Sequence, residues 1–238
     1  MELNKIYLGD CYELIKQIPD NSVDLIYTDP PYLFQNGGFG SGMFKDKKCP
    51  YGDIRNTILV RGIDNSILDE FVRVMKRINI YIWCNKAQVP EYLNFFAQYD
   101  CLFEILTWHK TNPTPITNNT FLPDTEYCLY FRERGVLLND GYELKSKFHI
   151  SNTNKNDKDD FHHPTIKPLE LVKRHILHST AENALVLDTF IGSGTTAIAC
   201  RELNRQFIGF EIDPKWHKIA VDRLNNIDAN GQISMLAR

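Results

Sequence analysis

ALVLDTFIGSGTTAIACREL, residues 184–203, is the stretch that decides the fold class. It opens with a short apolar run typical of a buried strand, continues through Gly192 and Gly194, and ends in a segment with the composition of a helix. Strand, glycine turn and helix in this order are typical of a doubly wound α/β sheet, in which the turn lets a ligand approach the backbone closely. The stretch therefore predicts a parallel sheet with a ligand site at the end of this strand.

The same alternation of strand and helix continues over most of the chain. Strand-like apolar runs occupy 5–9, 23–32, 78–85, 101–108, 126–133 and 206–211. Helical periodicity is found in 11–18, 66–78, 89–99 and 169–179. The two runs 101–108 and 126–133 are predicted to be neighbouring strands. The whole pattern predicts a doubly wound, Rossmann-like, mostly parallel α/β sheet.

A length of 238 residues suits one large domain with a small insert better than two full domains. The pattern dissolves into polar, Asn- and Asp-rich sequence between Gly135 and His162, so 133–162 is predicted to be an insert between the halves 1–132 and 163–238. A long mobile loop is predicted for 33–62 from the glycines at 37, 38, 40, 42 and 52.

Composition narrows the functional classes. Hydrophobic residues make up 43% and charged residues 24%, as in globular proteins, and the net charge of −3 excludes nucleic-acid binding driven by overall positive charge. The apolar runs are too short to span a membrane, and residues 1–20 do not resemble a secretory signal. Six cysteines without a CxxC pair indicate reduced thiols and a cytoplasmic location, and neither they nor the seven histidines predict a metal site.

Asp29-Pro30-Pro31-Tyr32 follows directly after an apolar strand, where ligands of open α/β sheets bind. The two prolines fix the backbone, so that a carboxylate, the carbonyl of Pro30 and an aromatic ring are held in one geometry. An exocyclic base amine is a poor nucleophile because its lone pair is delocalised into the ring. Two acceptors on its hydrogens, Asp29 and Pro30, would favour a usable lone pair while Tyr32 stacks on the base.

The glycine turn predicts an adenosine-type cofactor. Glu211 lies at the end of the next strand, where an acidic side chain can accept hydrogen bonds from ribose hydroxyls. Taken alone, the GSGTTA spacing also fits nicotinamide-binding folds, so this motif leaves both cofactors open.

Together these segments resemble the S-adenosylmethionine-dependent amino-methyltransferases of DNA, which act on adenine N6 or cytosine N4. The matching segments are GDC at 9–11, TDPPY at 28–32, HPTIKP at 163–168, DTFIGSGTT at 188–196 and GFEID at 209–213. The DPPY segment precedes the glycine motif, as in the circularly permuted β-group of that family. Thr189 departs from the family pattern, which has proline at this position.

The resemblance implies roles for individual residues. Those implied to be catalytic are Asp29, Pro30, Pro31 and Tyr32. Those implied to bind S-adenosylmethionine are Asp10, Cys11, Thr165, Lys167, Asp188, Phe190, Gly192, Ser193, Gly194, Thr195, Thr196 and Glu211. Asp10 and Cys11 match contacts to the adenine of the cofactor, and Thr165 and Lys167 are expected near its methionine end.

DNA contacts are expected from the loop 33–62, where five basic residues outnumber two acidic ones. A basic, glycine-rich arm beside the pocket can follow the phosphate backbone and close on an extruded base. The basic residues are Lys45, Lys47, Lys48, Arg55 and Arg61. The insert 133–162 has no excess of positive charge and is assigned to target recognition only because it is the piece left over from the methyltransferase core.

The sequence thus predicts a site-specific enzyme that methylates adenine N6 in double-stranded DNA by direct transfer to a flipped base, with S-adenosylmethionine as cofactor and no metal. Cytosine N4 is the alternative acceptor, and RNA or a protein glutamine also presents an amino group. A nicotinamide-dependent oxidoreductase and a non-catalytic DNA-binding regulator are the alternatives from other classes. A homodimer and a cognate restriction endonuclease are further hypotheses about partners; no membrane association is expected.

Overall fold

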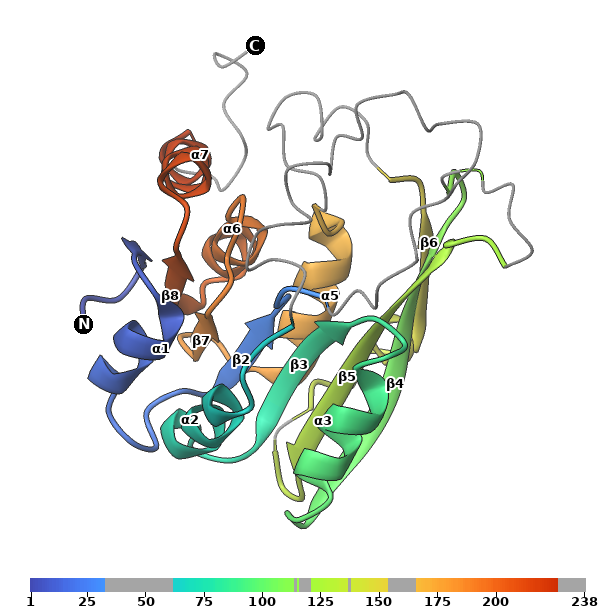
Figure 1. The fold of residues 1–238 in the computed structure, drawn as a ribbon, viewed down its shortest axis with the longest axis horizontal. Coiled ribbons are helices and arrows are strands. Elements are labelled where there is room, and N and C mark those ends of the chain that lie inside the picture. The colour runs from blue at the N-terminus through green and yellow to red at the C-terminus, as the bar shows by residue number, and fades with distance from the viewer. Residues whose placement is uncertain (33–61, 114, 116–120, 137, 154–165, 227–238) are drawn as a thin grey trace.

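The structure is a computed structural model and describes residues 1–32, 62–113, 115, 121–136, 138–153 and 166–226. In this part of the chain eight strands form one sheet in the order β1-β8-β7-β2-β3-β5-β4-β6 (Figure 1). The strands are β1 (Lys5–Leu8), β2 (Leu25–Thr28), β3 (Asn79–Cys84), β4 (Cys101–Lys110), β5 (Thr125–Glu133), β6 (Phe148–Ser151), β7 (Leu185–Asp188) and β8 (Gln206–Glu211).

Strands β1, β8, β7, β2 and β3 pair in parallel, whereas β5 runs antiparallel to both β3 and β4. The predicted mostly parallel α/β sheet is therefore confirmed, and so is the prediction that 101–108 and 126–133 are neighbouring strands. The parallel half contains both sequence motifs, so their strands end at the same edge of the sheet.

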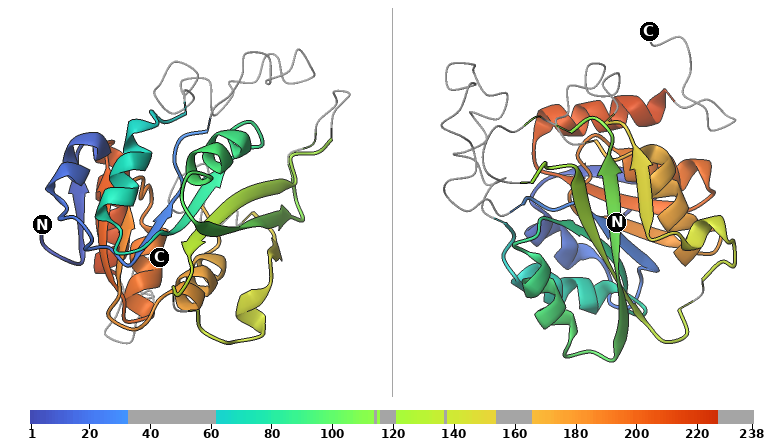
Figure 2. Two further views of the ribbon diagram at one scale, coloured as in Figure 1. Left: turned by 90° about the horizontal axis from the view of Figure 1, so that it is seen from below. Right: turned by 90° about the vertical axis from the view of Figure 1, so that its right-hand side faces the viewer.

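Helices cover both faces of the sheet (Figure 2). One hydrophobic core joins it to α1 (Cys11–Leu14), the 3-10 turn η1 (Ile15–Gln17), α2 (Ser66–Val74) and α3 (Val89–Phe96). A second core joins the other face to α5 (Leu169–Ser179), α6 (Thr195–Glu202) and α7 (Pro214–Asn225). Two cores on opposite faces are what a doubly wound sheet requires, because its central strands are buried on both sides.

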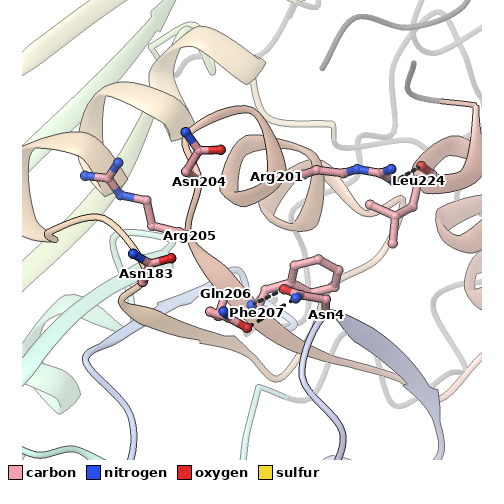
Figure 3. A pocket seen from close by; sticks show the side chains of 8 residues that line it. All are labelled: Asn4, Asn183, Arg201, Asn204, Arg205, Gln206, Phe207 and Leu224. Atoms are coloured by element: carbon pink, nitrogen blue, oxygen red, sulfur yellow. Dashed lines mark hydrogen bonds between the residues drawn. The ribbon is translucent and has the colours of Figure 1, made fainter. Parts of the chain in front are cut away.

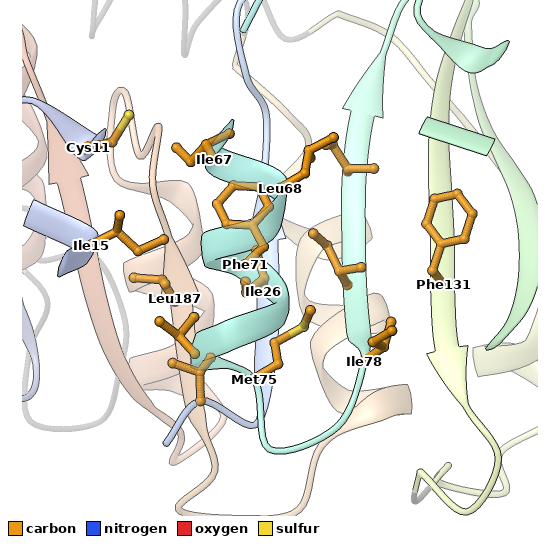
Figure 4. Close-up of a cluster of buried hydrophobic side chains, with 14 of the residues drawn as sticks. Cys11, Ile15, Ile26, Ile67, Leu68, Phe71, Met75, Ile78, Phe131 and Leu187 are labelled. Carbon is orange, nitrogen blue, oxygen red and sulfur yellow. The ribbon is translucent and has the colours of Figure 1, made fainter. Parts of the chain in front are cut away.

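Helix α2 shows how the sequence produces this packing. The Ser66 amide donates to Asp64 Oδ1 at 2.8 Å, which satisfies a free N–H at the start of the helix. Ile67, Leu68 and Phe71 follow at helical spacing, and all three are fully buried. Figure 4 shows them beside Ile26 of β2 and Leu187 of β7. Burying each of these side chains contributes roughly 1.5–3 kcal/mol, so α2 is held firmly against one face of the central strands.

Tyr81, Trp83, Tyr92 and Phe96 are buried in the two cores, and Phe95 is partly buried against the first of them. The described part of 133–162 holds the short 3-10 turn η4 (Glu143–Lys145) and β6, which pairs in parallel with β4. Part of the predicted insert therefore extends the sheet. Its sequence gives little sign of this, because β6 has only four residues and its two apolar ones, Phe148 and Ile150, are exposed.

A hollow of about 420 Å³ lies where β1, β7 and β8 begin, at the amino ends of these strands (Figure 3). Its lining is Asn4, Asn183, Arg201, Asn204, Arg205, Gln206, Phe207 and Leu224. Arg205 is buried there, but its guanidinium already donates to Thr180 and to the Leu203 carbonyl. Because it lies at the amino ends of these strands, this hollow is at the opposite end of the sheet from both motifs.

No helix within the described residues has the length and apolar character to cross a membrane.

Candidate active site

The carboxyl ends of β2, β7 and β8 bring the two motifs together. These strands are parallel and adjacent, and they end at Thr28, Asp188 and Glu211. The hydroxyls of Thr28 and Thr189 share a hydrogen bond of 3.2 Å, which ties the DPPY strand to the glycine turn. Thr189, which departs from the family's proline, therefore supplies a polar contact between the two halves of the site.

Asp29 is held by a lysine from a distant part of the chain. Lys167 Nζ donates to Asp29 Oδ2 and lies 3.3 Å from Tyr32 Oη and 3.2 Å from Glu126 Oε2. Lys110 pairs with the other oxygen of Glu126. Tyr32 Oη also donates to Glu126 Oε2 at 3.3 Å. The structure thus brings the tetrapeptide into a cluster of two acids and two bases, and places Lys167 at its centre.

The backbone of the tetrapeptide is supported from the start of α3. Gln88, which is buried, donates through Nε2 to the carbonyl of Pro31 at 3.3 Å and to Tyr92 Oη at 3.2 Å. Two prolines limit the backbone torsions of the tetrapeptide, and the hydrogen bond from the Gln88 side-chain amide holds the turn against α3. The position of Tyr32 is therefore determined from both sides.

Charge in the cluster follows from burial and pairing. Burial raises the pKa of Asp29; Lys167 lowers it, Glu126 raises it further, and the net direction is upward. Burial would also raise the pKa of Glu126, but Lys167 and Lys110 lower it to about 2. Burial disfavours the ammonium of Lys167, yet Asp29 and Glu126 raise its pKa above its ordinary value. Glu126 is therefore ionised and Lys167 protonated at neutral pH.

One oxygen of Asp29 is left available. Oδ1 is buried and has no hydrogen-bond partner among the residues that the structure describes, while Oδ2 is occupied by Lys167. A buried acceptor without a donor is costly, so such an atom at a strand end is typical of a ligand site. An amino group is the kind of ligand that supplies the missing hydrogen.

The glycine turn is organised by its own backbone. Asp188 accepts from Thr196 Oγ1 at 2.6 Å and from the Phe190 amide at 3.1 Å, and its burial raises its pKa to about 7. Glu211 accepts from the amides of Gly192 and Asp213, each at 2.9 Å. Burial also raises the pKa of Glu211. These contacts form a cradle at the start of α6, and Glu211 joins it from the end of β8.

A family model described as DNA methylase matches residues 23–222, which is most of the chain. The chain belongs to the DNA methylase family. Two curated relatives are each 32% identical to it: Type II methyltransferase M2.LlaDCHI of Lactococcus lactis subsp. cremoris and Type II methyltransferase M2.DpnII of Streptococcus pneumoniae. The alignments cover 91% and 93% of this chain and 87% and 90% of those proteins.

Solved structures agree with this assignment. The M1.HpyAVI–SAM complex is 26% identical, with a TM-score of 0.68 over 92% of this chain and 99% of the other. The PvuII DNA methyltransferase, named as cytosine-N4-specific, is 17% identical with a TM-score of 0.70 over 95% of this chain and 87% of its own, and shows the shared fold alone. The DNA methylase is thus an S-adenosylmethionine-dependent enzyme with the class I methyltransferase fold.

The glycine turn of this DNA methylase fits that cofactor. Gly192 and Gly194 have φ values of 53° and 87°, and at these two positions the turn presents no Cβ atom. A carboxylate has about four acceptor sites, so Glu211 keeps room for ribose hydroxyls beside its two backbone bonds. When bound, S-adenosylmethionine supplies an electrophilic methyl group. Glu211 is the residue that would hold its ribose.

The remaining residues expected at the cofactor have separate positions. Asp10 accepts from the Tyr12 amide at 2.9 Å and begins α1, and the Gly9 amide donates to the carbonyl of Glu211, so this turn borders the cradle. Cys11 is buried, and burial raises the pKa of its thiol to about 12, which leaves it an apolar neighbour and no nucleophile.

Ser193, Thr195 and Thr196 are buried within the glycine motif. Arg223 of α7 donates to the carbonyl and hydroxyl of Ser193 at 2.6 and 2.9 Å, so Ser193 anchors the turn to α7. Phe190 packs against the core on the α2 side. Six predicted site residues lie outside the described residues: Thr165, Lys45, Lys47, Lys48, Arg55 and Arg61.

Sequence reasoning missed the partners of the tetrapeptide, above all Glu126, Lys110 and Gln88. Glu126 is a charged residue directly before the apolar run of β5, and this position was the one available signal. Nothing in the sequence connects it to Asp29.

Within the described part of the chain, no group of three His, Cys, Asp or Glu side chains is placed to hold a metal ion.

Proposed function

We propose that this DNA methylase transfers a methyl group from S-adenosylmethionine to the N6 amino group of adenine in double-stranded DNA. The observation that supports it most directly is the buried Oδ1 of Asp29, which lacks a donor among the described residues and lies next to an oxygen already bound by Lys167. An exocyclic amine meets this need and becomes a better nucleophile by doing so.

The residues of the tetrapeptide divide the work. Asp29 Oδ1 and the carbonyl of Pro30 accept the two hydrogens of the amine, and Tyr32 stacks on the base. A base inside a duplex cannot reach such a pocket, so the target is flipped out of the helix. The amine nitrogen would take the methyl group from the sulfonium sulfur, whose bond to that methyl would break to leave S-adenosylhomocysteine, and the amine would give up one proton to Asp29, the acceptor placed to receive it. No covalent bond between enzyme and base is needed.

The test is incubation of the purified protein with duplex DNA and labelled S-adenosylmethionine, followed by digestion to nucleosides and mass spectrometry. N6-methyladenine is expected. N4-methylcytosine would place the acceptor on the other base that the family methylates, and label in neither base would reject the proposal.

Sequence recognition is assigned to 133–162, together with phosphate contacts from Lys45, Lys47, Lys48, Arg55 and Arg61. The Type II names of the relatives support a role beside a restriction endonuclease. Methylated DNA that resists a nuclease cutting the same sequence is the outcome that would support this role. Sequencing the modified sites in DNA from cells that express this methylase identifies the sequence that it recognises.

A further inference from the structure

Four charged side chains meet beside the tetrapeptide, and the reaction proposed above uses only Asp29. Lys167 precedes α5, Glu126 lies in β5 and Lys110 in β4, so each charge comes from a different element. Exposed fractions are 24% for the Asp29 side chain, 6% for Lys167, 14% for Glu126 and 17% for Lys110. Two acids and two bases make a formally neutral set, which explains how so much charge is tolerated with so little water.

Lys167 has no donor to spare for another group. An ammonium has three N–H bonds, and three oxygens surround this one: Asp29 Oδ2, Glu126 Oε2 and Tyr32 Oη. The ammonium also lies over the indole ring of Trp83, 4.8 Å from its centroid. These contacts hold Lys167 at Oδ2 of Asp29, and Oδ1 keeps no donor among the described residues.

Resting on the proposed methyl transfer, we propose that Lys167 and Glu126 are positioning residues with opposed effects on Asp29. Lys167 keeps Asp29 ionised and turns its Oδ1 toward the base, while Glu126 orients Lys167 and Tyr32 and limits how strongly the lysine attracts the carboxylate. Asp29 is thereby kept as a hydrogen-bond acceptor that is still able to take the proton of the amine.

The electrostatics agree with this division. Lys167 lowers the pKa of Asp29, whereas burial and Glu126 raise it. Cys84 of β3 and Asp188 at the end of β7 also interact with Asp29. Among the residues that the structure describes, the titratable and charged groups around Asp29 are Tyr27, Tyr32, Cys84, Tyr92, Lys110, Glu126, Cys128, Lys167 and Asp188. Lys167 is the group among them that contacts the Asp29 carboxylate directly with a positive charge.

The experiment is the pH dependence of the single-turnover methylation rate, with saturating cofactor and duplex DNA. An ionised Asp29 is the active form, so the rate rises with pH through its pKa. Lys167→Met removes the attracting charge, and the rising limb moves to higher pH, with at least about a tenfold loss of rate at neutral pH that is recovered in alkali. Glu126→Gln removes the repelling charge, and the limb moves to lower pH.

Three further variants serve as controls. Lys167→Arg keeps the charge and therefore keeps the limb near its wild-type position, even where the rate itself falls. Lys173→Met and Glu104→Gln remove the same groups from ion pairs elsewhere, Lys173 with Glu202 and Glu104 with Lys147, and leave the limb unmoved. Far-ultraviolet circular dichroism and calorimetric titration of the cofactor show that each variant is folded and loaded.

Opposite displacement of the limb in the two variants supports the proposal. A limb that stays in place in both, or moves in one direction in both, overturns it, because a loss of packing alone has no reason to act with the sign of the removed charge. If Lys167→Met does not fold, the shift in Glu126→Gln to lower pH decides. A wild-type protein that methylates no base would instead reject the proposed function itself, which separates the two failures.

Discussion

Asp29 and Asp188 each end a central parallel strand, yet the chain holds them in different ways. Asp188 is bonded by residues two and eight positions away, Phe190 and Thr196. Asp29 is bonded by Lys167, 138 positions away, and its neighbour Tyr32 by Glu126, 94 positions away. The two hydrogen bonds that Asp188 accepts are thus local, although Glu211 and Arg223 join the cofactor cradle from β8 and α7, whereas the charged partners of Asp29 all come from distant segments of the chain. Substitutions in the two regions should therefore have different consequences.

The largest effect is expected for Asp29→Ala. Removing the carboxylate at the reacting amine should cost ~3 kcal/mol or more of the activation barrier, about a hundredfold or more in kcat. The cradle of Asp188 and Glu211 does not include Asp29, so the Kd for S-adenosylmethionine should stay at the wild-type value. Steady-state kinetics and calorimetric titration measure the two quantities. Turnover at the wild-type rate would contradict the assigned role.

A comparison of Glu126→Ala with Glu104→Ala separates a buried cluster from a surface pair. Glu126→Ala leaves Lys110 without its partner and removes one partner of Lys167, so the free energy of unfolding should fall by about 3 kcal/mol. Glu104 and Lys147 have side chains 48% and 62% exposed, and solvent screens their pair, so Glu104→Ala should cost about 0–1 kcal/mol. Urea unfolding measures both. Equal losses would mean that the cluster is not desolvated as described.

On the cofactor side, Glu211→Ala should weaken binding and leave chemistry intact. A carboxylate that accepts from ribose hydroxyls contributes roughly 1.5–3 kcal/mol, so the Kd for S-adenosylmethionine should rise about ten- to a hundredfold. The rate constant at saturating cofactor should change little, the reverse of Asp29→Ala. An unchanged Kd in calorimetry would remove Glu211 from the ribose site.

The contrast between contacts within a short segment and contacts between distant segments also explains which features the sequence could predict. The strand, glycine turn and helix at 184–203 and the DPPY end of β2 are local patterns, and both were predicted with their positions at the sheet edge. The three parallel strands that end there follow from the alternation of strand and helix. Short sequence patterns were therefore enough to predict the fold class and to identify both motifs.

Contacts that cross the sheet could not be read in this way. Lys167 was predicted near the methionine end of the cofactor because HPTIKP leads into the glycine half, and that role stays a prediction. The sequence did not predict that its ammonium pairs with Asp29 and with Glu126 of β5. That placement depends on how α5 packs behind β2 and on the antiparallel pairing of β5 with β3, and neither leaves a mark in the HPTIKP segment itself. Strand β6 was missed for a related reason: its apolar side chains face solvent, so no burial pattern precedes it.

The smallest effect, and the one confined to the local cradle, is expected for Gly194→Ala. Gly194 has φ of 87°, and a Cβ there would lie 3.1 Å from the Cβ of Ala220 in α7. A side chain in this backbone region costs roughly 1–2 kcal/mol, so the free energy of unfolding should fall by about that amount.

A double variant shows how much of this loss is contact and how much is backbone strain. Ala220→Gly opens the space beside Gly194 but carries its own cost of about 1 kcal/mol as a glycine in a helix. If the contact matters, the loss in Gly194→Ala/Ala220→Gly falls short of the sum of the single losses by about 0.5 kcal/mol or more. Strict additivity would assign the effect to the dihedral angle and to the backbone of residue 220, whose Cα would lie 3.2 Å from the new Cβ in either background. Under either result the effect of Gly194→Ala stays within the glycine turn, and the methylation rate at saturating cofactor should not change. A fall in that rate would show instead that the glycine turn is coupled to Asp29 through Thr28 and Thr189.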